Sequence, residues 1–158
     1  MASLPFVDLS ALDLNRRITT REEIYSVLPH RYEFMQLDGI IFADIENWLA
    51  VAVREVREDE FWVRGHIPGR PLLPGVLMIE TAAQLAAYMT VLLVPDQNRF
   101  WGFGGVENVK FRAAVTPPAR MYFILKGVEF RPRRSIADVQ GWVDGKLAFE
   151  GRMIGMPV

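Results

Sequence analysis

Two side chains near the middle of the sequence could exchange protons with a substrate: His66 and Glu80. His66 lies between Gly65 and Gly69, and prolines at positions 68, 71 and 74 restrict the backbone around it. An imidazole has an ordinary pKa of about 6.5, so it gives and takes protons near neutral pH. A rigid loop holds such a group in place for proton abstraction. We therefore interpret His66 as a general base in preference to a loop histidine that only caps or packs.

Glu80 lies in the apolar stretch 76–94, among isoleucine, alanine and leucine. An unpaired carboxylate there is costly to ionise, so we expect its pKa to be raised. The alternative is a structural carboxylate satisfied by Gln84, one helical turn further on, or by a backbone amide. A buried glutamate near a loop histidine favours an acid/base pair.

The sequence Pro74-Gly75-Val76 opens the same stretch. The first backbone N–H groups of a helix have no partner within it and attract negative charge. The amides of Gly75 and Val76 could therefore stabilise charge that develops on a substrate oxygen. Viewed alone, the segment could equally be a well-made helix start; together with His66 and Glu80 it favours a catalytic role.

The remaining reactive residues point to little other chemistry. His30, the second of two histidines, is interpreted as structural, because two histidines without ligand spacing make a poor metal site. We find no Gly-x-Ser-x-Gly elbow and no glycine-rich phosphate loop, which argues against serine hydrolases and nucleotide enzymes. A cluster of Arg131, Arg133 and Arg134 is either a solvated turn or a contact for an acidic protein partner.

Composition limits the class of protein. The chain has 158 residues, of which 51% are hydrophobic and 23% charged, enough for one domain with a sizeable core. A net charge of −1 and the lack of nucleic-acid-binding signatures predict no nucleic-acid partner. The absence of cysteine excludes disulfides and thiolate chemistry and suits a reducing compartment. The first ten residues lack a basic region, so we expect no signal peptide and a cytoplasmic location.

The first part of the chain predicts an extension, a short helix and a hairpin. Residues 1–18 are interpreted as an irregular N-terminal extension, and residues 19–158 as a single domain without repeats or linkers. Thr20 and Glu23 have the spacing of a capping box that opens a helix, which Pro29 should end. Two extended segments follow, Asp38–Ile45 and Trp48–Val56, the second with alternating apolar residues.

The stretch 76–94 is long enough to cross a membrane, but its composition favours a helix buried in a soluble domain. Alanines fill its middle, and it includes the polar residues Glu80, Thr81, Gln84 and Thr90. After a break at 95–98, β-rich stretches cover 100–113, 121–130 and 136–150, the last with a turn at Gly145. The sequence thus predicts an α+β fold in which a five- to six-stranded antiparallel sheet wraps one long helix.

Several of these segments resemble a known family in the same order. The run Leu28-Pro29-His30-Arg31-Tyr32, the loop 65–76, and then Glu80 and Gln84 resemble the 3-hydroxyacyl-acyl-carrier-protein dehydratases of dissociated fatty-acid synthesis. The segments 103–106 and 109–112 are similar to that family's next strand, and 143–146 to its closing hairpin. The resemblance covers roughly residues 20–155 and leaves out the N-terminal extension.

The resemblance implies the hotdog fold and a homodimer or trimer of dimers with sites at the dimer interface. It implies that His66 of one subunit takes the α-proton of a 3-hydroxyacyl thioester, while Glu80 of the other helps the 3-hydroxyl leave as water. Substrate delivery by acyl carrier protein is implied, and no metal or redox cofactor is required. The substrate-binding residues expected from the matching positions are Gly75, Val76, Gln84, Phe103 and Gly104.

Differences from the family pattern leave alternatives open. Related dehydratase-isomerases typically carry aspartate at the position of Glu80, so plain dehydration is favoured. Glu33 follows Tyr32 where the family usually has proline, and Pro117-Pro118-Ala119 replaces a common Pro-Gly-Asp turn. The alternatives are a specialised paralogue in polyketide or other lipid synthesis, a non-catalytic acyl-binding module and, more distantly, a thioesterase.

Overall fold

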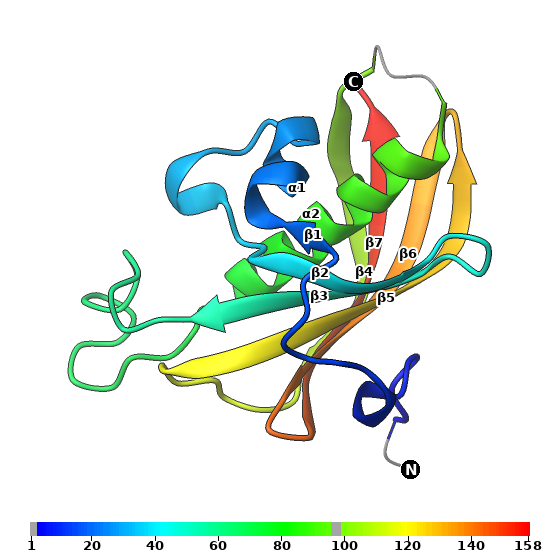
Figure 1. Ribbon diagram of the computed structural model, residues 1–158. Helices are drawn as coiled ribbons and strands as arrows, with labels where there is room; N and C mark the ends of the chain where they lie inside the picture. The colour runs from blue at the N-terminus through cyan, green and yellow to red at the C-terminus, as the bar shows by residue number, and fades with distance from the viewer. Residues whose placement is uncertain (1–2, 96–98) are drawn as a thin grey trace.

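The computed structural model describes residues 3–95 and 99–158, so residues 96–98 of the expected chain break lie outside the described residues. One antiparallel sheet curls around a long helix (Figure 1). The helices are α1 (Arg21–Val27) and α2 (Gly75–Leu93). The strands are β1 (Thr19–Thr20), β2 (Gly39–Asp44), β3 (Leu49–Val56), β4 (Trp101–Phe111), β5 (Ala119–Arg131), β6 (Arg134–Val143) and β7 (Lys146–Pro157).

The spatial order of the strands is β1-β2-β3-β5-β6-β7-β4, so that β4 forms one edge of the sheet. The predicted α+β fold, a long helix wrapped by an antiparallel sheet, is confirmed, and it is the hotdog architecture that the resemblance implied. The sheet has seven strands where five or six were expected. The additional strand, β1, pairs with β2 through two residues only, which is too short for an alternating pattern to reveal.

Local signals at the start of the domain are confirmed. Thr20 Oγ1 accepts from the Glu23 amide at 3.2 Å, and Glu23 Oε2 accepts from the Thr20 amide at 2.7 Å, which completes the capping box. Helix α1 ends at Val27, shortly before Pro29. Its buried face carries Tyr25, whose ring turns toward α2 and reaches the site described below.

Helix α2 runs along the inner face of the sheet and packs against β4, β5, β6 and β7. Small residues such as Ala82 face the sheet, so the helix and the strands approach closely. By length and composition alone α2 could span a membrane, with a mean hydropathy of 1.6, but 56% of that window is buried within the fold. Core helices of soluble domains share these properties.

The outer face of the sheet is covered by the segment that precedes β1, which is dark blue in Figure 1. Because β3 is covered on both faces, its alternation separates two kinds of residue. Ala50 and Ala52 pack in the core around α2, whereas Val51 and Val53 pack in a second cluster on the outer face. The N-terminal side chains on that cluster are Phe6, Val7, Leu9, Leu12 and Leu14.

Candidate active site

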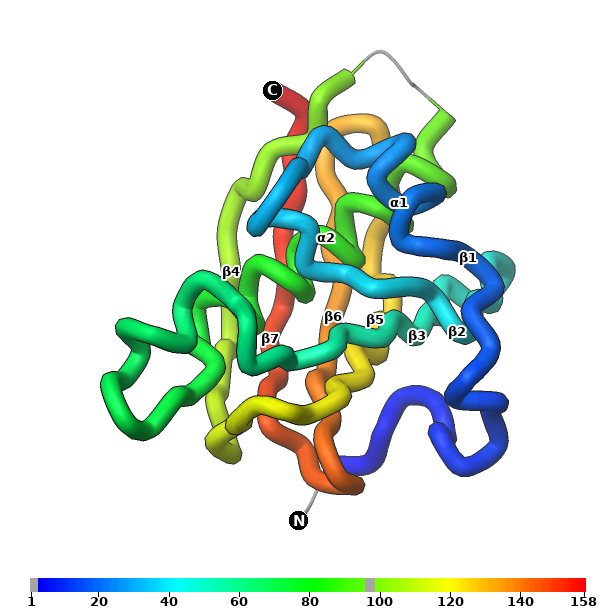
Figure 2. The backbone as a smooth tube through the Cα atoms, turned by 60° about the vertical axis from the view of Figure 1, so that its left-hand side comes forward, coloured from blue at the N-terminus to red at the C-terminus, as the bar shows by residue number. Residues whose placement is uncertain are grey.

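His66 lies in the irregular segment 57–74 between β3 and α2, which projects from the body of the fold (Figure 2). The segment is anchored at its start, where the buried guanidinium of Arg54 donates to both carboxylate oxygens of Glu60 at 2.7 and 3.2 Å. Buried Trp62 holds the next part, and its carbonyl accepts from the His66 amide at 2.8 Å. The loop backbone is therefore fixed although His66 itself is exposed.

The imidazole of His66 has a defined orientation and tautomer. Its Nδ1 lies 2.8 Å from the carbonyl oxygen of Leu72. A carbonyl can only accept, so in the neutral ring Nδ1 carries the hydrogen and Nε2 keeps its lone pair. This arrangement presents Nε2 as a proton acceptor, which is the form that a general base requires.

The hollow next to His66 contains the start of α2, including Gly75 and Val76. Pro74 caps the helix without a side-chain hydrogen bond, and no acidic residue lies in the first turn. The partial positive charge of the helix start is thus uncompensated by side chains of this turn. A Cβ on Gly75 would come within 2.8 Å of the Phe111 ring, so a larger residue here would displace that ring.

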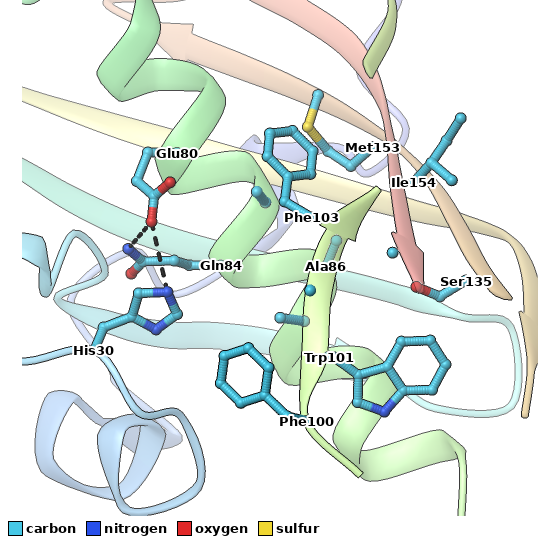
Figure 3. Close-up of a pocket in the computed structure, with 14 residues that line it drawn as sticks. His30, Glu80, Gln84, Ala86, Phe100, Trp101, Phe103, Ser135, Met153 and Ile154 are labelled. Atoms are coloured by element: carbon cyan, nitrogen blue, oxygen red, sulfur yellow. Dashed lines mark hydrogen bonds and ion pairs between the residues drawn. The ribbon is translucent and has the colours of Figure 1, made fainter. Parts of the chain in front are cut away.

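Glu80 lies on the next turn of α2 but lines a different cavity, of about 160 Å³, shown in Figure 3. Glu80, Gln84 and His30 form the polar end of this cavity. Its other walls come mainly from alanines of α2 and from aromatic and aliphatic residues of β4 and β7. They include Ala83, Ala86, Ala87, Phe100, Trp101, Phe103, Met153 and Ile154.

Gln84 holds the carboxylate of Glu80, donating from Nε2 to Oε1 at 2.8 Å. The second Nε2 hydrogen goes to the carbonyl of Phe34 at 2.6 Å. The amide oxygen accepts from the Tyr25 hydroxyl at 2.6 Å and from the Gln36 amide at 3.3 Å. All four hydrogen-bonding positions of the Gln84 amide are therefore occupied. The expected alternative contact, Gln84 with Glu80, is present in the structure.

His30 approaches the same carboxylate from the segment after α1. Its Nε2 lies 3.5 Å from Glu80 Oε1, and its ring contacts Tyr25 edge to face. Burial lowers the pKa of His30, the nearby carboxylate of Glu80 opposes this, and Arg31 adds to the lowering. The direction of this shift favours the neutral imidazole beside Glu80.

One chain does not bring all the predicted site residues together. His66, Gly75 and Val76 share the first hollow. Glu80, Gln84 and Phe103 share the second. Gly104 lines neither, and a Cβ there would meet the Met156 side chain at 2.9 Å.

Two residues near Glu80 lie outside the site that the sequence predicts. The sequence predicts a structural role for His30 and does not predict its contact with the carboxylate. The bond from Tyr25 to Gln84 spans 59 positions, which no local pattern could reveal. Within residues 3–95 and 99–158, no group of three or more His, Cys, Asp or Glu side chains could hold a metal ion.

Comparison with known proteins places these features in a family. The model of the FabA-like domain matches residues 28–152. A 3-hydroxyacyl-[acyl-carrier-protein] dehydratase FabZ of Acetivibrio thermocellus is 33% identical over 134 residues, covering 85% of this chain and 91% of the relative. The FabZ dehydratase of Lactococcus lactis subsp. cremoris is 33% identical over 131 residues, covering 83% and 90%.

Solved structures share the fold at lower sequence identity. The dehydratase heterocomplex ApeI:P of Xenorhabdus doucetiae has a TM-score of 0.71 at 14% identity, covering 90% of this chain and 93% of that one. A mutant thioesterase of Pseudomonas aeruginosa has a TM-score of 0.64 at 18% identity, covering 90% and 98%. These likenesses concern the fold alone, since dehydratases and thioesterases share it.

Proposed function

The chain belongs to the FabA-like domain family, and from this we propose that it dehydrates 3-hydroxyacyl thioesters carried on acyl carrier protein, giving trans-2-enoyl thioesters in fatty-acid synthesis. The observation that carries the proposal is the geometry of His66. Its Nδ1 is committed to Leu72, which leaves Nε2 as the ring nitrogen available to a substrate, and the residue lines the hollow that contains the start of α2. A base beside an uncapped helix start suits proton abstraction next to a thioester carbonyl.

The complete site is proposed to form between two copies of the chain. Strand β4 is an edge of the sheet and exposes the apolar side chains of Phe103, Val106 and Phe111. A long apolar edge favours pairing with another strand. The hollow of His66 lies at the Phe111 end of β4, and the cavity of Glu80 at the Phe103 end.

A two-fold axis between two subunits would bring the His66 hollow of one chain next to the Glu80 cavity of the other. When β4 pairs antiparallel with its copy, the Phe111 end of one strand lies beside the Phe103 end of the other. His66 of one subunit then approaches Glu80 of the second, as the family resemblance implied. A dimer contains two such sites, and the proposal extends to a homodimer or a trimer of dimers.

The reaction divides between the two groups. His66 Nε2 takes the α-proton, and the electrons of the broken C–H bond form an enolate whose oxygen accepts from the Gly75 amide. The enolate then forms the C=C bond and expels the 3-hydroxyl, which leaves as water with a proton from Glu80, directly or through a water molecule. No electron passes to or from the substrate, so the reaction needs no redox cofactor, and the proposed steps assign both proton transfers and the charge on the enolate oxygen to His66, Glu80 and the Gly75 amide.

The remaining assignments follow from this activity. Residues 19–158 are proposed as the catalytic domain and residues 1–18 as an extension that covers the outer face of the sheet. Val76, Gln84, Phe103 and Gly104 are proposed to bind or position substrate. We place the protein in the cytoplasm, with neither a nucleic-acid partner nor a membrane span.

Hydration of a crotonyl thioester, followed by the loss of absorbance of the conjugated double bond, tests the proposed activity. Wild type should be active, and His66→Ala and Glu80→Gln should each lose at least about a hundredfold in turnover. Wild-type inactivity on crotonyl and longer enoyl thioesters would point to a specialised or non-catalytic hotdog protein. Full activity of His66→Ala would reject the proposed base.

Co-expression of the two variants tests the shared site. A mixed dimer contains one site with both substitutions and one with both native residues. Random mixing should therefore restore about a quarter of wild-type activity. A mixture as inactive as either variant would show that His66 and Glu80 do not act across an interface.

Carrier docking is proposed at the hairpin between β5 and β6. Arg131 and Arg133 are exposed there, while Arg134 pairs with Glu129 through two hydrogen bonds of 3.0 and 3.1 Å. Exposed cations raise the rate of association with an acidic partner. Arg131→Glu with Arg133→Glu should weaken the use of an acyl-carrier substrate several-fold and leave a short thioester mimic unaffected. Equal effects on both substrates would argue against docking at this hairpin.

A further inference from the structure

The hydrogen bonds around Glu80 have a fixed direction. The Leu37 amide donates to the Tyr25 oxygen at 2.8 Å, so the hydroxyl hydrogen is free to point to Gln84 Oε1. With its oxygen so engaged, Gln84 must present its NH₂ group to Glu80. Oε1 of Glu80 is therefore the end point of a chain of donors that starts at a backbone amide.

His30 reaches this same oxygen. Its Nε2 lies 3.5 Å from Oε1, within ion-pair range but longer than the roughly 2.7–3.2 Å of an ordinary N–H···O hydrogen bond. Its other ring nitrogen, Nδ1, is buried and has no hydrogen-bond partner among the described residues. A buried N–H group without an acceptor is rarer and costlier than a buried lone pair. The hydrogen of the neutral ring therefore belongs on Nε2, facing Glu80.

We propose that His30 is a positioning residue for Glu80, held as the neutral Nε2–H tautomer so that the transferable proton of the carboxyl group resides on Oε2. Gln84 donates a hydrogen bond to Oε1, and the Nε2–H group of His30 faces the same oxygen from 3.5 Å, so a proton on that oxygen would meet two N–H groups. Oε2 accepts no hydrogen bond among the described residues and is left for the substrate hydroxyl. The catalytic consequence rests on the proposed function, whereas the tautomer does not.

The groups around His30 favour this neutral state. A second hydrogen would have to be placed on the buried Nδ1, where it lacks an acceptor. The carboxylate of Glu80 favours the charged ring, but burial and the adjacent Arg31 oppose it. Tyr25 contributes a ring edge and uses its hydroxyl elsewhere. In the proposed two-subunit site, His66 of the second chain is a further titratable group near Glu80.

The tautomer can be measured directly, because the chain contains only two histidines. In ¹⁵N-labelled wild-type protein, nitrogen shifts and two-bond couplings distinguish the two neutral tautomers from the charged ring, and His66→Gln assigns the signals. His30 should be the Nε2–H tautomer from pH 7 to 8, while neutral His66 should be the Nδ1–H tautomer. An Nδ1–H tautomer or a charged ring at His30 at pH 7 would overturn the proposal.

The functional arm compares His30→Gln with His30→Leu in enoyl thioester hydration. In this direction Glu80 acts as a base, so activity falls as Glu80 becomes protonated. Leucine removes an N–H group that faces Oε1, which makes the carboxylate form less favourable and should move the acidic limb of the kcat/KM profile up by about half to one pH unit. Glutamine keeps an N–H donor and should keep the limb within about 0.3 units of wild type.

The outcomes separate the proposal from its premise. An unshifted limb in an active His30→Leu variant would overturn the positioning role, as would equal shifts in the leucine and glutamine variants. Inactive wild type would reject the dehydratase function and leave the tautomer measurement intact. If His30→Leu does not fold, as judged by thermal unfolding, the nitrogen shifts of the wild-type protein still decide the tautomer.

Discussion

The two sides of the sheet each contain a buried glutamine that hydrogen-bonds residues distant in sequence, and the two differ in what they hold. On the inner side, Gln84 of α2 joins Tyr25, Phe34 and Glu80. On the outer side, Gln140 of β6 accepts from the Phe6 amide at 3.0 Å and donates to the Leu4 carbonyl at 3.0 Å. Both are nearly inaccessible to solvent, at 1% and 4% exposure.

The difference lies in the partners. Gln140 bonds the backbone of the N-terminal segment and the indole of Trp142, at 3.2 Å, and so attaches that segment to the sheet. Gln84 bonds a titratable carboxylate at the end of a cavity. The same side chain thus serves attachment on one face and orientation of a reactive group on the other. Burial and satisfied hydrogen bonds alone do not identify a functional residue.

Of the substitutions that test this difference, loss of Gln84 should have the largest effect on activity. In Gln84→Leu, the Phe34 carbonyl loses a bond and Glu80 Oε1 loses its closest donor, so the carboxylate is no longer oriented. Hydrogen bonds to charged groups are worth about 1.5–3 kcal/mol, which predicts a loss of about tenfold to a hundredfold in kcat. Steady-state kinetics with a crotonyl thioester measure this. An unchanged kcat in a folded variant would contradict the orienting role.

Removal of the Tyr25 hydroxyl should have a smaller effect. Tyr25→Phe leaves the buried Leu37 amide without its acceptor and Gln84 with only the longer bond from the Gln36 amide. Gln84 still reaches Glu80, so we expect kcat to fall about threefold to tenfold, with a loss of about 1–3 kcal/mol in the free energy of unfolding. Kinetics and urea unfolding measure the two quantities. A loss of kcat equal to that of Gln84→Leu would show that Tyr25 acts by another route.

The contacts around Glu80 also show which features of the structure the sequence could predict. The capping box, the hairpin and the long helix rest on local patterns, and each is present within two residues of the expected bounds. The loop of His66 could be predicted equally well, because its glycines and prolines lie next to the histidine in the sequence. The contact of His30 with Glu80 joins positions 50 apart and depends on how α1 packs on α2.

The faces of β3 illustrate a second limit. Alternation along residues 49–56 predicts a strand but does not say which side meets the helix. The larger residues, Val51 and Val53, face the N-terminal segment, and Ala50 and Ala52 face the core around α2. Residue size alone suggests the opposite arrangement, with the valines facing the core. Only the packing of the N-terminal segment, which lies outside the family match, reveals which side of β3 meets the helix.

Gln140 provides the matched control for Gln84, with the smallest expected effect on activity. Gln140→Leu removes the bonds to Phe6, Leu4 and Trp142 on the face opposite Glu80. The free energy of unfolding should fall by about 1–3 kcal/mol because two partly buried backbone groups of the N-terminal segment, at Leu4 and Phe6, lose their partner. Its kcat should stay within about twofold of wild type, since no bond to Gln84 or Glu80 changes. Urea unfolding and crotonyl thioester kinetics on the same preparation measure both. A kcat loss as large as that of Gln84→Leu would mean that the outer segment also controls the site, and would remove the distinction between the two faces.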